Sequence, residues 1–156
     1  MAGEAPGLPA LEVTDRRDDA TAKAVLAGLL EHNRPFLGEV AFRYLGVTAR
    51  DGGGRLLGGL AGQTSNAFLY IDLLWAAAAE RGRGLGSRLL LAAEAESLAR
   101  GCRSAVVDTF DFQARPFYER HGYAVFGTLD GYRNGHRRFF MVKRLGGAGA
   151  GWGRDG

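Results

Sequence analysis

Short hydrophobic stretches separated by turn residues recur along this chain, and they predict a set of β-strands. The stretch from Phe68 to Ala76 is almost wholly apolar, as expected of a strand covered on both faces. Two further stretches flank Asp51-Gly52-Gly53-Gly54, a strong signal of a hairpin turn. We expect seven strands in all, over residues 11–13, 43–50, 55–63, 68–76, 104–109, 123–128 and 137–143.

Apolar residues at helical spacing predict three helices among these strands, with a fourth short helix or a loop after residue 38. The first is expected from Asp18 to Glu31, capped by Thr14 or Asp15 and broken by the segment 32–38. The second runs from Leu85 to Arg100 and ends at Gly101, and the third covers 114–121 before Gly122. We therefore expect one α/β (α+β) domain over residues 10–145, with a loose N-terminus over 1–9 and a flexible glycine-rich tail over 146–156.

Composition and charge exclude several classes of protein. The net charge of +3 is mild and the densest basic cluster, 133–138, is a short turn, which argues against nucleic-acid binding. No apolar run approaches the roughly 20 residues of a membrane span. No charged-then-apolar signal segment opens the chain either, so we expect no membrane partner and a cytoplasmic location. A single cysteine, Cys102, and three scattered histidines argue against a metal site.

The most informative stretch is the turn from Arg81 to Arg88, between an apolar strand and an amphipathic helix. Its glycines at 82, 84 and 86 let the backbone turn tightly and bring N–H groups close to a ligand. The helix that follows adds unpaired N–H groups and a partial positive charge, so the turn is suited to hold phosphate. The P-loop pattern is absent because no lysine follows the last glycine, and the glycine spacing does not fit a dinucleotide-binding loop.

The motif Arg81-x-x-Gly84-x-Gly86 resembles the pyrophosphate loop of the GNAT (GCN5-related) N-acetyltransferases. About thirty residues later, Ala114-x-x-Phe117-Tyr118-x-x-x-Gly122-Tyr123 is similar to a second block of that family. The order of elements also resembles the GNAT fold, a mixed, mostly antiparallel sheet of about seven strands, splayed in the middle and flanked by about four helices. Two departures are Asp111, where the family often has asparagine, and residues 76–79, where it often has proline.

The resemblance implies two catalytic residues. Asp72 interrupts an apolar strand, where a carboxylate is costly to bury, and it stands where GNAT enzymes of small amines often carry an acid that accepts the proton or orients the amine. A buried aspartate paired with an arginine or with backbone amides explains it as well. Tyr118 matches the tyrosine that faces the sulfur of CoA and is the candidate proton donor, although it is also compatible with a core aromatic residue.

The resemblance also implies how acetyl-CoA, the expected co-substrate, is bound. Backbone groups of the strand end and of the glycine loop, with two residues before the third helix, are expected to hold it: Leu74, Trp75, Ala76, Arg81, Gly82, Arg83, Gly84, Leu85, Gly86, Ser87, Asp111 and Gln113. The acceptor pocket is expected near Phe36, Tyr44, Asp130 and His136, although ordinary turn chemistry explains the last two equally well.

The expected function is therefore transfer of the acetyl group of acetyl-CoA to a primary amine by direct attack, with a small-molecule amine as acceptor. A protein lysine or N-terminus is the alternative acceptor, and a non-catalytic acetyl-CoA sensor is the alternative outside enzymes. The family resemblance allows a homodimer, for which the sequence indicates no interface.

Overall fold

The computed structural model describes residues 7–147, and the chain falls into two compact units, residues 1–39 and 40–156, which are described separately. The expectation of one domain over 10–145 therefore stays a prediction. Most of the expected tail, 148–156, lies outside the described residues. No helix within residues 7–147 is long and apolar enough to cross a membrane.

The first unit contains one helix, α1 (Asp19–Leu37), and no strand in its described part. Asp18 caps it by accepting a hydrogen bond from the amide of Ala20, so the expected cap at residue 14 or 15 is wrong. The expected end before residue 32 is also wrong, because the helix continues through Pro35 to a left-handed Gly38, whose N–H bonds to the carbonyl of Arg34. The expected strand at 11–13 is absent, since this exposed segment has no strand to pair with.

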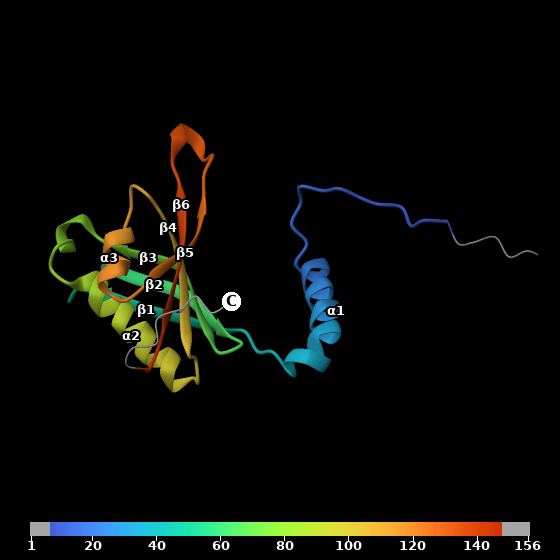
Figure 1. Cartoon of the computed structure of the whole chain (residues 1–156), viewed down its shortest axis with the longest axis horizontal. Helices are drawn as coiled ribbons and strands as arrows, with labels where there is room; N and C mark the ends of the chain where they lie inside the picture. The colour runs from blue at the N-terminus through green and yellow to red at the C-terminus, as the bar shows by residue number, and fades with distance from the viewer. Residues whose placement is uncertain (1–6, 148–156) are drawn as a thin grey trace, which may run out of the picture. The chain divides into compact units, whose positions relative to one another are not determined.

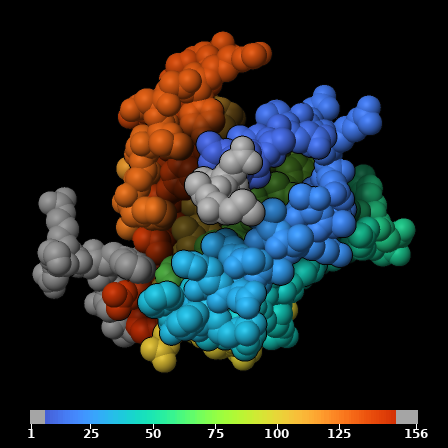
Figure 2. All heavy atoms as spheres, turned by 90° about the vertical axis from the view of Figure 1, so that its right-hand side faces the viewer, coloured from blue at the N-terminus to red at the C-terminus, as the bar shows by residue number. Residues whose placement is uncertain are grey.

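The second unit is a mixed six-stranded sheet with the order β1-β2-β3-β4-β6-β5. Its strands are β1 (Arg43–Arg50), β2 (Leu56–Ser65), β3 (Phe68–Ala76), β4 (Ser104–Phe110), β5 (Ala124–Leu129) and β6 (Arg138–Arg144). Its helices are α2 (Leu85–Ala99), α3 (Arg115–Arg120) and two short 3₁₀ turns, η1 (Ala78–Glu80) and η2 (Arg133–Gly135). The described residues thus hold six strands and three α-helices, against the seven and four expected, and the expected fold class is confirmed. The β5–β6 hairpin extends past the other strands at its η2 end (Figures 1 and 2).

The sheet opens between its two central strands. All neighbours pair antiparallel except β3 and β4, which are parallel and pair only over Phe68–Ile71 with Ser104–Val107. Beyond Ile71 and Val107 the strands separate, which produces the expected splay. The expectation that β3 is covered on both faces is wrong, because buried Leu69 and Ile71 alternate with exposed Tyr70 and Asp72, and Leu73 exposes 68% of its surface.

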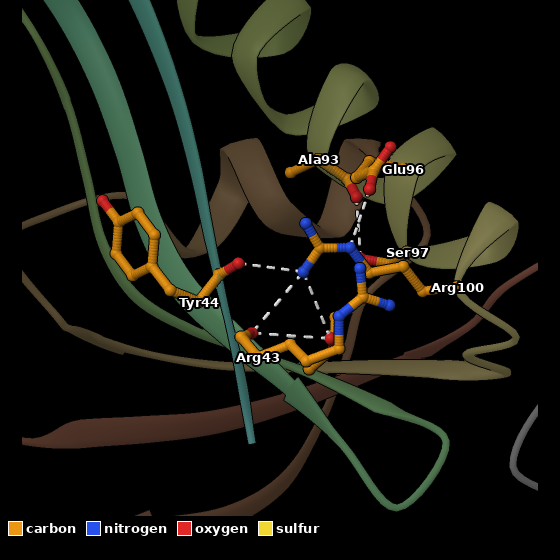
Figure 3. A network of polar contacts seen from close by, with 7 residues as sticks. Arg43, Tyr44, Ala93, Glu96, Ser97 and Arg100 are labelled. Carbon is orange, nitrogen blue, oxygen red and sulfur yellow. Dashed lines mark hydrogen bonds and ion pairs between the residues drawn. The ribbon is translucent and has the colours of Figure 1, made fainter. Parts of the chain in front are cut away.

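Helix α2 packs on β1, β2 and β3 (Figure 1). The core between them contains Leu45, Leu60, Leu69, Ile71, Leu89, Leu90 and Ala93. Arg100, just after α2, donates a hydrogen bond of 2.9 Å to the carbonyl of Tyr44 on β1 and pairs with Glu96 at 2.7 Å (Figure 3). Ser97 donates to the carbonyl of Ala93 in the same region. The bond from Arg100 to Tyr44 ties the C-terminal end of α2 to the sheet.

Candidate active site

The glycine loop joins the end of β3 to the start of α2. Gly82 and Gly84 have φ values of 74° and 82°, the left-handed region that glycine adopts without strain. Gly84 is the N-cap of α2, and the N–H groups of its first turn, Leu85, Gly86 and Ser87, have no partner within the helix. The loop thus presents a row of backbone donors at the positive end of the helix dipole.

A groove of about 420 Å³ runs along this loop. The end of β3, the glycine loop and α3 line it: Leu74, Trp75, Ala76, Glu80, Arg81, Gly82, Gly84, Leu85, Gly86, Ser87, Ala114, Phe117 and Arg120. The structure therefore brings together nine of the ten strand-end and loop residues expected to hold acetyl-CoA. The tenth, Arg83, pairs with Glu80 at 3.6 Å and lines a neighbouring cavity with Arg50 and Arg88.

Helix α3 closes one side of the groove through contacts that the sequence analysis missed. The side-chain oxygen of Ser87 lies 2.9 Å from Nε2 of His121, and the rings of His121 and Phe117 are 4.8 Å apart. A Cβ added at Gly86 would meet the Phe117 ring at 3.6 Å, so α3 packs closely on the loop. Ser87 and His121 are thirty-four residues apart, and no local pattern links them.

A second cavity, of about 270 Å³, lies in the opening between β3 and β4. Its walls are Ile71, Asp72, Leu73, Leu74, Val107, Asp108, Thr109, Phe110, Gln113, Ala114, Tyr118 and Arg138. Leu74 and Ala114 line both cavities, so the groove along the glycine loop leads into the splayed cleft. A long ligand held at the loop can therefore place one end between the two strands.

Tyr118 forms a buried wall of this cleft and exposes only 5% of its surface. Its hydroxyl makes no hydrogen bond to the other described residues, and the oxygen is not among their fully enclosed unpaired atoms. Burial, with a smaller effect of the Asp108 charge, raises the pKa of Tyr118 to about 12. The phenol is therefore protonated at neutral pH and free to donate to a group that enters the cleft.

Asp72 lines the same cleft but is exposed, so the expectation of a buried carboxylate is wrong. It is the first residue of β3 beyond the last pair with β4, and the irregular pairing of β3 with β2 between Ala61 and Gly62 leaves it without a partner there as well. An exposed carboxylate at the mouth of the cleft is suited to meet a charged ligand from solvent.

Two cleft residues, Asp108 and Arg138, were not singled out by the sequence analysis. Nε of Arg138 donates to Oδ1 of Asp108 at 2.6 Å, and a second guanidinium nitrogen lies against the same oxygen. The Arg138 carbon Cζ also lies 5.3 Å from the ring centre of Phe110 and 5.8 Å from that of Phe140. The only local signal was one charged residue, Asp108, in the otherwise uncharged stretch 104–110.

Asp111 and Gln113 organise the turn between β4 and α3. Asp111 accepts hydrogen bonds from the amide of Arg137 at 3.1 Å and from Nδ1 of His136 at 2.8 Å. Partial desolvation raises the pKa of Asp111, but these hydrogen bonds outweigh it and lower that pKa below its usual value. The side-chain oxygen of Gln113 accepts from the amide of Phe110 at 2.8 Å, and Gln113 also lines the cleft. Both side chains thus fix the turn through contacts within the protein, and their expected role in binding acetyl-CoA stays a prediction.

The four expected acceptor residues do not line the two cavities of the glycine loop and the cleft. Phe36 belongs to α1 in the first unit, and Tyr44 is an exposed residue of β1. Asp130 lies on the turn after β5, and His136 is paired with Asp111. Their role as acceptor residues stays a prediction. No group of three potential metal-binding side chains occurs in the described part of the chain.

Comparison with known proteins identifies a family that this chain matches. Residues 12–123 match the model of the acetyltransferase (GNAT) family. An acetyltransferase of Agrobacterium fabrum is 35% identical over 133 residues, which cover 85% of this chain and 97% of that protein. The blasticidin-S acetyltransferase of Streptomyces morookaense is 44% identical over 93 residues, or 59% of this chain and 68% of that protein.

Solved structures agree with the sequence comparisons. A crystal structure assigned as an acetyltransferase from Agrobacterium tumefaciens has a TM-score of 0.80 at 34% identity, and the match covers 88% of this chain and all of that one, 100%. An acetyltransferase from Bacillus cereus gives a TM-score of 0.75 at 28% identity, over 86% of this chain and 98% of that chain.

Proposed function

The chain belongs to the GNAT family of acetyltransferases, whose acetyl donor is acetyl-CoA, and on that premise we propose that it acetylates the primary amine of a small molecule. One observation carries the proposal: the groove along the glycine loop and the cleft between β3 and β4 share Leu74 and Ala114, and Tyr118 forms the wall of the cleft. A donor held at the loop and an acceptor held in the cleft would meet beside this phenol.

The groove fits the donor. The unpaired amides of Leu85, Gly86 and Ser87 and the left-handed glycines before them form a concave row of donors, which suits a pyrophosphate. Beyond residue 71 the backbone of β3 has no partner on the β4 side, so its end is free to pair with an extended arm of the donor. Arg81 is exposed at the loop and adds a positive charge.

Direct transfer needs few further parts. The acceptor nitrogen attacks the thioester carbonyl, a C–N bond forms, and the C–S bond breaks. The amine proton passes to Asp72 or through water to solvent, and the departing thiolate accepts a hydrogen bond or a proton from Tyr118. Cys102 is buried and lines neither the groove nor the cleft, which supports direct attack over an acyl-enzyme.

A small acceptor is supported by one relative and is compatible with the size of the cleft. The cleft cavity of about 270 Å³ suits a side chain or a small molecule. The relative that is 44% identical over 93 residues is named for acetylating blasticidin S, and this similarity favours a small amine over a protein acceptor.

The test is release of free thiol from acetyl-CoA with a panel of amines, amino sugars, amino acids and lysine-containing peptides, with the products identified by mass spectrometry. We expect amine-dependent thiol release and a singly acetylated small amine. Asp72→Asn should lower turnover and leave the affinity for acetyl-CoA unchanged, because Asp72 lies in the cleft and not at the loop. Glu119→Gln is the matched control, since Glu119 pairs with Arg115 outside both cavities. Thiol release that never exceeds the rate without enzyme would refute the proposal, and acetylation of peptides alone would refute its small-molecule part.

A further inference from the structure

Two carboxylates flank the point at which the central strands separate. The last residues paired between β3 and β4 are Ile71 and Val107. The next residue on each strand is an aspartate, Asp72 on β3 and Asp108 on β4, and both line the same cleft with Tyr118. The sequence therefore places one carboxylate on each side of the mouth of the cleft, beside the phenol of the proposed reaction.

Arg138, the arginine that lines the cleft, forms an ion pair with one of these carboxylates, Asp108. Two nitrogens of Arg138 converge on Oδ1 of Asp108. The aromatic rings of Phe110 and Phe140 lie beside it. Oδ2 of Asp108 accepts no hydrogen bond within the described residues, so Arg138 orients the carboxylate and leaves its second oxygen available.

The charges of the cleft leave an excess of one negative charge. Its ionisable side chains are Asp72, Asp108, Tyr118 and Arg138, and Tyr118 is protonated. Arg138 neutralises one aspartate, so the remaining charge attracts a cation and repels a carboxylate. An acceptor with a carboxylate next to its amine would bring that group toward two aspartates without a free arginine to receive it.

Resting on the proposed function, we propose that Asp108, oriented by Arg138, is a second acceptor-binding residue, and that with Asp72 it selects cationic amines that carry no carboxylate beside the reactive nitrogen. Asp72 and Asp108 hold the ammonium group from the two sides of the cleft before it loses its proton. Arg138 acts through Asp108 and is a positioning residue.

A purely structural role accounts poorly for the pair. The side chains of Arg138 and Asp108 are about one third exposed, 33% and 35%, and such ion pairs contribute only about 0–1 kcal/mol to stability. Strands β4 and β6 are already paired along seven residues, from Ser104 with Arg144 to Phe110 with Arg138. The sheet does not need this pair to hold its register, whereas the position of Asp108 in the cleft wall is what acceptor binding requires.

The test uses amines and the amino acids from which they differ by one carboxylate: agmatine with arginine, tyramine with tyrosine, and cadaverine with lysine. Thiol release and product masses are measured with the whole chain at saturating acetyl-CoA. We expect kcat/KM to be at least about tenfold higher for the best amine than for its carboxylated partner, roughly the effect of one charge-assisted hydrogen bond and the lost repulsion. For lysine, only products acetylated on the α-amine are compared, because its side-chain amine is remote from the carboxylate.

The Asp108→Asn variant separates recognition from folding. We expect it to raise KM for the preferred amine by about tenfold, to reduce the preference over the carboxylated partner, and to leave the dissociation constant of acetyl-CoA unchanged. Glu119→Gln removes the same charge outside both cavities and should keep KM and the preference. Arg138→Lys keeps the positive charge but loses the contact of two nitrogens with Oδ1 of Asp108. Because Asp108 is then less well oriented, the variant should raise KM for the amine more than it lowers kcat.

Two results would overturn this inference and leave the acetyltransferase activity standing. One is a preference for the amino acids over the amines. The other is an Asp108→Asn variant that binds acetyl-CoA and keeps both the KM for the amine and the preference. The absence of turnover with every amine and peptide would instead refute the proposed function and, with it, this inference.

Discussion

Replacing Tyr118 by phenylalanine removes the proposed proton donor and little else. The side chain is 5% exposed and its ring packs against Phe117 and Tyr123, contacts that phenylalanine keeps. The lost hydroxyl makes no hydrogen bond to the other described residues, so we expect the free energy of unfolding to change by less than about 1 kcal/mol. A loss of activity in this variant would therefore report on chemistry and not on folding.

The size of the effect follows from the pKa of the phenol. The pKa of Tyr118 is about 12, whereas a free cysteine thiol has a pKa near 8.5. Full proton transfer from the phenol to the leaving thiolate is therefore unfavourable, and the main contribution is a hydrogen bond to the leaving sulfur. A hydrogen bond to a charged group contributes about 1.5–3 kcal/mol, which corresponds to a loss of about 10- to 150-fold in kcat.

The assay is steady-state thiol release at saturating acetyl-CoA and amine, with acetyl-CoA affinity measured by calorimetry. We expect kcat to fall by that factor and the affinity to stay within twofold, roughly the error of such a comparison. Tyr70→Phe is the matched control, because Tyr70 lies on β3 outside both cavities and stacks on Phe68. An unchanged kcat in Tyr118→Phe would refute the role of Tyr118 as donor and leave it as a core aromatic residue.

Three further predictions test the loop, the core and the buried phenols. In Gly84→Ala, a residue at φ 82° carries a side chain, so we expect the free loop to relax away from the conformation that binds acetyl-CoA. Restoring that conformation on binding costs about 1–2 kcal/mol, which lowers the affinity by about 5- to 30-fold in calorimetry. Gly52→Ala, in a turn with open space and no positive φ, should bind normally, and equal affinities of the two variants would contradict the role of the loop. Glu94 is buried and accepts hydrogen bonds from Tyr123 at 2.9 Å and from Lys143 at 2.8 Å. Glu94→Ala should therefore lower the free energy of unfolding in urea by about 3–5 kcal/mol, and the exposed control Glu119→Ala by about 0.5 kcal/mol. A loss below about 1 kcal/mol in Glu94→Ala would show that the fold does not need this network. Burial raises the pKa of Tyr118 to about 12 and, with the Glu94 charge, also raises the pKa of Tyr123. The unfolded chain therefore loses these protons first, and the free energy of unfolding should fall as pH rises from about 10 to 12, less steeply in Tyr118→Phe. A constant free energy of unfolding over this range would contradict the burial of both phenols.

The sequence predicted the strands and the glycine loop well because their signals are local. The limits of β1 and β3 agree with the expectation, and Gly101 and Gly122 take the left-handed conformation expected just after helices. The glycine spacing at 82–86 pointed to the groove, and Gly82 and Gly84 take the left-handed conformation that glycine allows in a tight turn.

The contents of the cleft could not be predicted in the same way because they depend on pairing between distant strands. Asp72 was expected to be buried, whereas it is exposed at the point where β3 leaves β4 and skips a pair with β2. Asp108 and Arg138 are thirty residues apart, and their ion pair exists because β4 lies beside β6. The contact between Ser87 and His121 depends in the same way on how α3 packs against the loop. Helix α1 was expected to end at Glu31 because the segment 32–38 was interpreted as a break, whereas the helix continues to Leu37 and Gly38 caps it.

The most direct test of the account is mass-spectrometric detection of acetyl transfer from acetyl-CoA to agmatine, followed over time with the wild-type chain and with Asp72→Asn. We expect an acetylated amine that forms with one equivalent of free CoA thiol, and slower formation in the variant at an unchanged affinity for acetyl-CoA. Tight binding of acetyl-CoA without a product from agmatine or from any other amine tested would contradict the account and leave a protein that binds the donor and transfers nothing.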